Sequence, residues 1–458
     1  MHGALASAAG GRRLIGCCAL TGALMLAPAP AQAKVCALDV VPAATLLLPY
    51  FEVDLEALDQ SDGLTTAFTV HNAAPDPAVV HITFWTDYAL PTLDFDVFLT
   101  GFDVQQFDLR EAFRGNLPRT ADEQTDPDDA ISPHGANPEW DGSFDLPPNC
   151  ANFFPFDNPV IPSLLLDRLT NGHLGLPILG GDQCLGSSVG DGIARGYITM
   201  DNVRRCSLEF PFDPGYFSGV NPVASNDNQL WGEFRIVDRA KGVEIREALV
   251  HLEADPELGP EGSTPTGYTF YGAFSGGDDL REPLGSVWSS RYVSAPIGDV
   301  ETDWIVWRDP TSSAVPTSLS VPCDEPPAWA PLQEAEVFCT DGDGFDFFPC
   351  AADGDGAGDP ACFPLATQRI AVGSLGFPVA AGLCRFDLNA DDSFPGDVDF
   401  PGPGSTSAQS YVLTSFSPMG SFEIGFQATA FAGACDLPPG APSRPAGENQ
   451  TAPGGITP

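Results

Sequence analysis

The chain has 458 residues, of which 62 are acidic and 20 are basic, so its formal net charge at pH 7 is −42. Such a charge repels nucleic acid and anionic lipid, and we expect no nucleic-acid partner because no basic patch is available to neutralise phosphates. The 45 Pro and 48 Gly leave little room for long helices.

The first 33 residues have the composition of a cleavable secretory signal. They contain no Asp or Glu, carry the pair Arg12-Arg13, continue with the apolar run Leu14–Leu26 and end in Ala31-Gln32-Ala33. We therefore predict a mature chain that begins at Lys34 and is secreted to the extracellular space, the cell surface or the periplasm. The apolar run is shorter than the roughly 20 residues that span a bilayer, so no membrane span is predicted.

Short β-type patterns alternate with turn-rich breaks after the signal. In the segments 64–72 and 80–85, apolar and polar residues alternate as in a strand with one buried face. One helix is predicted over Ser163–Thr170, between Pro162 and the stop Asn171-Gly172. Further strands are predicted over Phe95–Leu99, Gly196–Met200, Leu230–Val237, Glu247–Glu253, Tyr268–Phe274, Trp304–Trp307, Tyr411–Phe416 and Phe422–Ala430. The pattern predicts an all-β fold of antiparallel β-sandwich architecture with few short helices.

Cysteine spacing suggests how the chain is divided. The ten cysteines after the signal are Cys36, Cys150, Cys184, Cys206, Cys323, Cys339, Cys350, Cys362, Cys384 and Cys435. An even number in an exported chain predicts disulfides, and the lack of any C-x-x-C pair argues against structural zinc and thioredoxin-type chemistry. Four cysteines precede a long gap and six follow it, so we predict that each group closes on itself. The pairing within each group stays open.

Composition predicts two domains joined by a proline-rich connection. An N-terminal β-sandwich part is expected over 34–310, with a long surface excursion at 120–148, and a Cys/Asp-rich β domain over 331–436. The linker is placed at 311–330, where prolines are frequent. The Pro/Gly/Ala-rich tail 437–458 is expected to be disordered.

The acidic, glycine-rich stretch Cys339–Cys362 is the strongest chemical feature, with the sequence CTDGDGFDFFPCAADGDGAGDPAC. Calcium takes about six to eight oxygen ligands, and carboxylates at every second position with glycines at sharp turns can surround it. The candidate ligands are Asp341, Asp343, Asp346, Asp353, Asp355 and Asp359. The half 353–362 resembles the calcium repeats of thrombospondin type 3 modules, although Pro360-Ala361 departs from that pattern. The alternative is a solvated, disulfide-tethered turn region.

A second acidic loop, FDLNADDSFPGDVDF, begins like an EF-hand or dockerin calcium loop. It places Asp387, Asn389 and Asp391 at the first, third and fifth positions. The sixth position, normally Gly, is Asp392, and the twelfth, normally an acidic residue, is Val398. Calcium at this loop is a second hypothesis, with an ordinary Asp/Gly turn as the alternative.

Three further patterns are weaker. Gly186–Gly190 matches the G-x-S-x-G nucleophile elbow around Ser188, but the surrounding glycines indicate a loop rather than a strand-to-helix turn. His71 and His81 could face one another on adjacent strands. Trp304 and Trp307 should point to opposite faces of a strand, which could leave one of them exposed.

Several runs resemble a group of large secreted bacterial proteins without an assigned function. These runs are ATLLLPYFEVDL, TTAFTVHN, FWTDYALPTLDFDVFLTGFDV and GYITMDNVRRCS. The resemblance implies export and a β-rich fold and carries no catalytic residues. We predict a secreted acidic structural or binding protein, stabilised by calcium, that recognises a protein or carbohydrate surface. The alternatives are a carbohydrate-binding module or secreted hydrolase, and a surface or filament subunit assembled by strand exchange.

Overall fold

The computed structural model describes the greater part of the chain between residues 40 and 430. The described ranges are 40–60, 63–118, 150, 155, 158–178, 181–240, 242–255, 269–272, 279–285, 287–293, 300–309, 321–323, 336–340, 345–349, 365–375, 381–388, 409–418, 424–427 and 429–430. These residues form antiparallel sheets with short helices, which confirms the predicted all-β fold. No helix within these ranges is long and apolar enough to cross a membrane.

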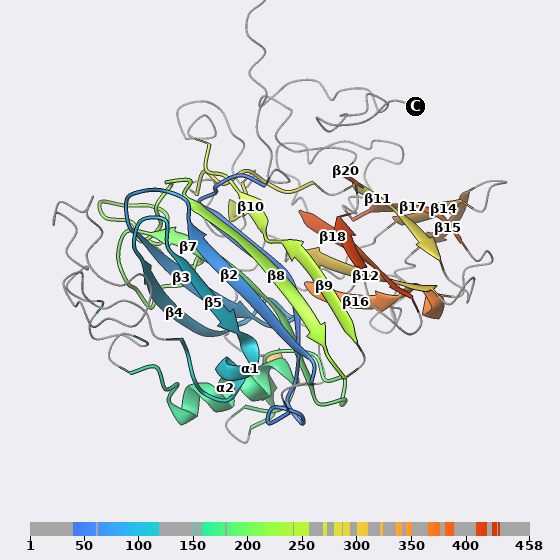
Figure 1. Ribbon diagram of the computed structural model, residues 1–458, viewed down its shortest axis with the longest axis horizontal. Helices are drawn as coiled ribbons and strands as arrows, with labels where there is room; N and C mark the ends of the chain where they lie inside the picture. Colours follow the sequence, from blue (N-terminus) through green and yellow to red (C-terminus); the bar gives the residue numbers. More distant parts are fainter. Residues whose placement is uncertain are drawn as a thin grey trace, which may run out of the picture. The chain divides into compact units, whose positions relative to one another are not determined.

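Two sheets form the part of the fold that precedes residue 256. The first has the strand order β10-β1-β7-β3-β4, and the second has the order β5-β2-β8-β9 (Figure 1). Their bounds are β1 Thr45–Asp54, β2 Thr65–Asn72, β3 Ala78–Trp85, β4 Pro91–Leu99, β5 Val104–Asp108, β7 Ile193–Val203, β8 Leu230–Asp238, β9 Val243–Ala248 and β10 Val250–Leu252. β1 packs on β2 and β8, so the two sheets face each other as a sandwich.

Strands β11, β12 and β14 to β20 form a second pair of sheets. Their orders are β16-β12-β18-β19 and β15-β14-β17-β11-β20, and β11 packs against β12 and β18. The bounds are β11 Val287–Val293, β12 Val300–Arg308, β14 Glu336–Thr340, β15 Phe345–Pro349, β16 Thr367–Ala371, β17 Ala381–Asp387, β18 Ser410–Pro418, β19 Ile424–Gln427 and β20 Thr429–Ala430. A short 3-10 turn, Val372–Leu375, follows β16. β11 and β12 precede the predicted linker but pair with strands that follow it. The second pair of sheets therefore begins at β11, before the linker.

Strand β1 is the centre of the packing. Its first nine residues are buried, because β1 contacts β2 and β8 as well as β12 and β16. A register shift between Leu48 and Phe51 surrounds Pro49, which has no N–H for the ladder. The free carbonyl of Pro49 accepts a hydrogen bond of 2.5 Å from Thr367 Oγ1 on β16. The irregularity therefore connects the two pairs of sheets.

Charged side chains also cross this contact. Arg369 of β16 donates to Asp303 of β12 at 2.6 Å and reaches Glu52 of β1 at 3.3 Å. Glu52 in turn accepts the Tyr50 hydroxyl at 2.7 Å and lies 3.8 Å from Arg195 of β7. These contacts tie strands far apart in sequence to one buried carboxylate.

Two short helices lie together at one end of the first two sheets (Figure 1). α1, Leu109–Phe113, begins at Asp108, whose side chain accepts the Arg110 backbone N–H. α2, Ser163–His173, follows Pro162 and contacts β4 and β7. It confirms the predicted helix and extends it by three residues, to His173.

The disulfides contradict part of the cysteine prediction. Cys150 bonds Cys206 within the first group, but Cys184 bonds Cys323 of the second group. The cause is a strand pairing that brings together two segments distant in sequence. Strand β13, Val321–Pro322, pairs with β6, Gln183–Cys184, and so places Cys323 beside Cys184. Residues 321–323 are the described part of the predicted linker. The division into two domains stays a prediction, and the excursion 120–148, the signal and the tail 437–458 lie outside the described residues.

A row of buried polar side chains crosses the first sheet. The strand register places Thr45, Asp201, His81 and Asp96 directly opposite one another on β1, β7, β3 and β4. His81 Nδ1 lies 2.9 Å from Asp96 Oδ1, and Asp201 accepts hydroxyl hydrogen bonds from Thr45 at 2.5 Å and Tyr216 at 2.8 Å. Burial makes each of these bonds obligatory, because an unpaired polar group in a sheet core is costly.

Several predicted details are wrong. Strand β3 is buried on both faces rather than one, since its sheet is covered on both sides. His71 and His81 belong to different sheets, and Trp304 and Trp307 are both buried. The predicted strand Tyr268–Phe274 is instead a turn over its described residues 269–272.

Candidate functional site

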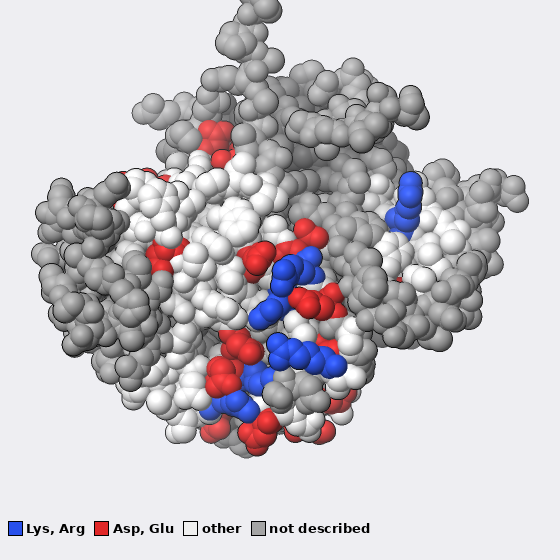
Figure 2. Space-filling view, in the orientation of Figure 1, with Lys and Arg blue, Asp and Glu red and all other residues white. Residues whose placement is uncertain are grey.

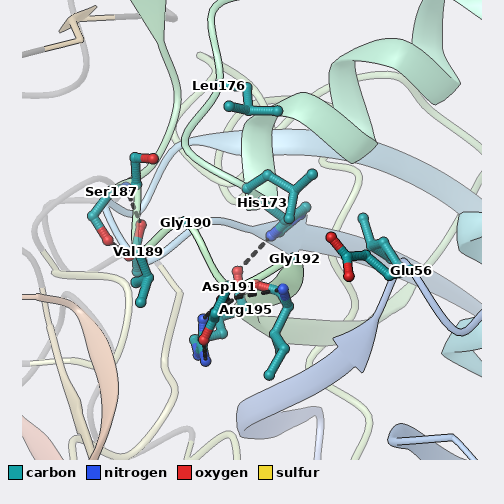
Figure 3. A pocket seen from close by; sticks show the side chains of 14 residues that line it. Glu56, His173, Leu176, Ser187, Val189, Gly190, Asp191, Gly192 and Arg195 are labelled. Carbon is teal, nitrogen blue, oxygen red and sulfur yellow. Dashed lines mark hydrogen bonds and ion pairs between the residues drawn. The ribbon is translucent and has the colours of Figure 1, made fainter.

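A cavity of about 400 Å³ lies beside the end of α2, at the end of the first sheet where β1 and β3 finish and β7 begins. Its wall combines the loop between β6 and β7 with the residues that follow β1, β3 and α2, and with Arg195 of β7 (Figure 3). Chain segments more than a hundred residues apart therefore meet at one place. The bonding of its titratable groups decides what chemistry the cavity can carry out.

His173 is held as a neutral ring at the base of the cavity. It is 4 % exposed; its Nδ1 donates to the Arg195 carbonyl at 2.8 Å and its Nε2 lies 2.8 Å from Thr92 Oγ1. Burial lowers the pKa of His173 to about 4. The ring approaches β7 closely because Gly196 has no side chain: a Cβ there would lie 2.8 Å from the imidazole and 2.2 Å from the Trp85 carbonyl. Both ring nitrogens are thus engaged in positioning the ring.

Asp87 fastens the loop between β6 and β7. Its carboxylate accepts the Ser187 backbone N–H at 2.9 Å and also the Ser187 hydroxyl. Burial raises the pKa of Asp87 to about 6, although the hydrogen bonds from Ser187 oppose the rise. Gly175, at φ +63°, passes so close beneath Ser187 that a Cβ there would lie 2.2 Å from its backbone. The Ser187 hydroxyl faces a carboxylate rather than the imidazole of His173.

Arg195 and Asp191 form an ion pair at the cavity wall. The guanidinium donates to both carboxylate oxygens, at 2.9 Å through Nη1 and 2.5 Å through Nη2. These hydrogen bonds lower the pKa of Asp191. The Nε of Arg195 faces Glu52 at 3.8 Å, so two carboxylates share the positive charge of Arg195.

The rest of the wall is apolar, with one further carboxylate. The apolar lining residues are Leu55, Leu174, Leu176, Val189 and Ile193. Leu176 is 41 % exposed and Val189 is 62 % exposed, so the apolar surface continues to the mouth. Glu56 is exposed and packs over Gly192, where a Cβ would lie 2.9 Å from Glu56 Cγ. In the view of Figure 3, Glu56 and Ser187 lie on opposite sides of the cavity.

The G-x-S-x-G motif lies in this wall. Residues 185–190 form a loop after the two-residue strand β6, as the glycine-rich surroundings predicted, and no helix follows. Ser188 is exposed and lines the cavity. Sequence reasoning drew attention to this loop but missed Asp87, His173 and Arg195, because these residues come from separate elements and no local spacing connects them.

The predicted calcium ligands are placed only in small part. Asp341, Asp343, Asp353, Asp355, Asp359, Asn389 and Asp391 lie outside the described residues. Asp346 stands on β15 opposite Cys339, and Asp387 stands on β17 opposite Glu336 and Val287. Within the described ranges, no group of three or more His, Cys, Asp or Glu side chains could hold a metal ion. Calcium binding by the two acidic loops stays a prediction.

Comparisons with known proteins add no relative. No protein-family model matches the chain, and no curated protein or solved structure matches it.

Proposed function

We propose that the chain is an extracytoplasmic binding protein that holds a small ligand with an apolar body in the cavity beside α2. The observation that carries the proposal is the cavity itself: its volume of about 400 Å³ falls in the range of small-molecule sites, about 300 to 1,000 Å³. Mostly apolar walls with a few placed polar groups are also usual for such sites.

The bonding of the polar groups favours binding over group transfer. A serine nucleophile needs a base within hydrogen-bond reach. Here both nitrogens of His173 bond to Thr92 and the Arg195 carbonyl. The carboxylate beside Ser187 belongs to Asp87. It also accepts a hydrogen bond from the Ser187 backbone N–H and so holds the loop in place. These residues shape the cavity and hold its loop in place.

The disulfides support a location outside the cytoplasm. Two disulfides connect the described strands and loops, and stable disulfides form in oxidising compartments. The predicted export signal agrees with such a location.

A neutral fluorescent probe tests the proposal. N-phenyl-1-naphthylamine brightens in an apolar environment, so the wild-type protein should give a saturable rise in fluorescence with one site per chain. Ser188→Trp should abolish this rise, because Ser188 is exposed and lines the cavity and the indole fills the space.

Val220→Trp is the matched control, because Val220 is fully exposed and does not line the cavity. It should bind the probe like the wild type. The proposal fails if the wild type shows no saturable binding, or if Ser188→Trp folds cooperatively and binds unchanged.

A further inference from the structure

We infer that the cavity selects a small organic cation with an apolar body, of which an alkylammonium ion is the simplest representative. The inference rests on the proposed binding function and adds the chemical class of the ligand. Three features carry it: the ion pairs that neutralise Arg195, a carboxylate at the mouth that pairs with no described residue, and the apolar wall between them.

The guanidinium of Arg195, which carries the positive charge in the wall, is already ion-paired. Arg195 donates to both oxygens of Asp191 and also faces Glu52. A ligand anion would have to compete with a bidentate carboxylate, the geometry that guanidinium binds most strongly. The wall therefore offers an anion no free positive charge, although it contains a guanidinium.

Glu56 offers a negative charge that no described residue neutralises. Its side chain is exposed at the cavity and makes no ion pair or hydrogen bond within the described part of the chain. Its methylene groups rest on Gly192, which adopts φ +72°. Because any side chain at Gly192 would displace Glu56, the glycine keeps the carboxylate beside the cavity.

The shape of the wall requires an apolar body on the cation. Leu55, Leu174 and Ile193 are half-buried in the wall, and Leu176 and Val189 extend it to the surface. A metal ion or a fully hydrated cation gains nothing from such a surface, whereas an alkyl chain gains roughly 25 cal/mol for each Å² removed from water.

The charge of the whole molecule acts in the same direction. A net charge of −42 raises the local concentration of cations and lowers that of anions. This long-range effect is screened beyond about 10 Å at 0.1 M salt, whereas the contact with Glu56 is affected less. Selectivity for the cation should therefore diminish, but not vanish, as salt is added.

Calorimetric titration of the full-length protein with three ligands of one chain length tests the inference. The ligands are octylammonium, octanol and octanoate, which share the apolar body and differ in charge. Octylammonium should bind about fivefold more tightly than octanol, as expected for an exposed ion pair, and octanoate more weakly than octanol by a similar factor.

Glu56→Gln should remove the preference of octylammonium over octanol, because glutamine lacks the charge but keeps the packing on Gly192. Glu244→Gln is the control: Glu244 is an exposed acid on β9 that does not line the cavity, so the preference should persist.

The outcomes separate the two claims. If octanol binds in the cavity but octylammonium shows no preference, or the preference survives Glu56→Gln, the cation assignment is wrong and the binding function stands. If none of the three ligands binds, and N-phenyl-1-naphthylamine does not bind either, the binding function itself is wrong.

Discussion

His81 is a buried cation in a chain that has few cations. Its ring is fully buried and its Nδ1 lies 2.9 Å from Asp96 Oδ1. Burial alone would lower the pKa of His81, but the adjacent charge and hydrogen bond of Asp96, with Asp94 and Asp201 nearby, raise it to about 9. The other ring nitrogen has no partner among the described residues. The charge of His81 therefore depends on Asp96.

This pair predicts a specific dependence of stability on pH. The folded-state pKa of His81, about 9, lies above its ordinary value of 6.5. The stabilisation from the pair is therefore complete below pH 6.5 and is lost as the pH rises through about 9. Urea unfolding at a series of pH values should show the free energy of unfolding falling over this window in the wild type.

Asp96→Asn should remove most of that fall and destabilise the protein by about 3 to 5 kcal/mol at pH 6.5, because a buried charge then loses its partner. The same substitution at Asp213, a half-buried residue that is not in the row, is the control. An alkaline fall that is equally large in Asp96→Asn would show that other groups cause it.

At the scale of elements, the alternation of apolar and polar residues predicts a strand well where one face of the strand is less buried than the other. β2 and β8 each alternate along part of their length between buried and half-buried residues, and both were predicted within a residue or two. β1 is buried almost throughout, its sequence shows no clean alternation, and it was not predicted from its pattern. β3 alternates in sequence, yet it is buried on both faces, so its alternation predicted the strand but not its burial.

The candidate site could not be predicted from the sequence, because its residues come from segments far apart in the chain. Its loop was visible as Gly186–Gly190, but the cavity exists because Asp87 reaches Ser187 over a separation of 100 residues. Cys184 and Cys323, 139 residues apart, show the same limit. Counting cysteines predicted two groups that close on themselves, and the Cys184–Cys323 bond contradicts this because the count carries no information on which strands pair.

The Cys184–Cys323 disulfide should be a major contributor to stability. It closes a loop over 139 residues, compared with 56 for Cys150–Cys206. Cross-links over long loops restrict the unfolded chain most. The variant with Cys184→Ser and Cys323→Ser should lose between about 2 and 5 kcal/mol in urea unfolding, with faster amide exchange in β6.

The variant with Cys150→Ser and Cys206→Ser is the comparison and should leave amide exchange in β6 unchanged. Equal exchange of β6 in wild type and in the Cys184 and Cys323 variant would contradict the role assigned to this disulfide.

At the scale of the whole molecule, the chain is strongly acidic, but one face carries basic side chains as well as acidic ones. Figure 2 shows basic and acidic side chains interspersed over the face that carries β8 and β9. Arg235 and Arg246 stand directly opposite each other there, with Glu233 and Glu244 on the same strands. A shallow hollow of about 120 Å³ on this face is smaller than a usual small-molecule site. The cavity beside α2 is therefore the better candidate for the ligand.

The two acidic loops in the C-terminal part of the chain are predicted to bind calcium and so to stabilise the folded protein. Ion binding to the folded state stabilises it by mass action, so excess EDTA should lower the melting temperature of the purified protein and added calcium should restore it. The combined variant Asp353→Asn and Asp355→Asn should lower the melting temperature without EDTA and show no further response to it. An unchanged melting temperature of the wild type in EDTA would contradict calcium stabilisation.

The most direct measurement is a crystal structure of the protein grown with octylammonium. The alkyl chain should lie in the cavity, against Leu55, Leu174 and Ile193, with the ammonium group within ion-pair distance of the Glu56 carboxylate. An octylammonium ion bound elsewhere, or bound in the cavity with its ammonium group directed away from Glu56, would contradict the proposed ligand class.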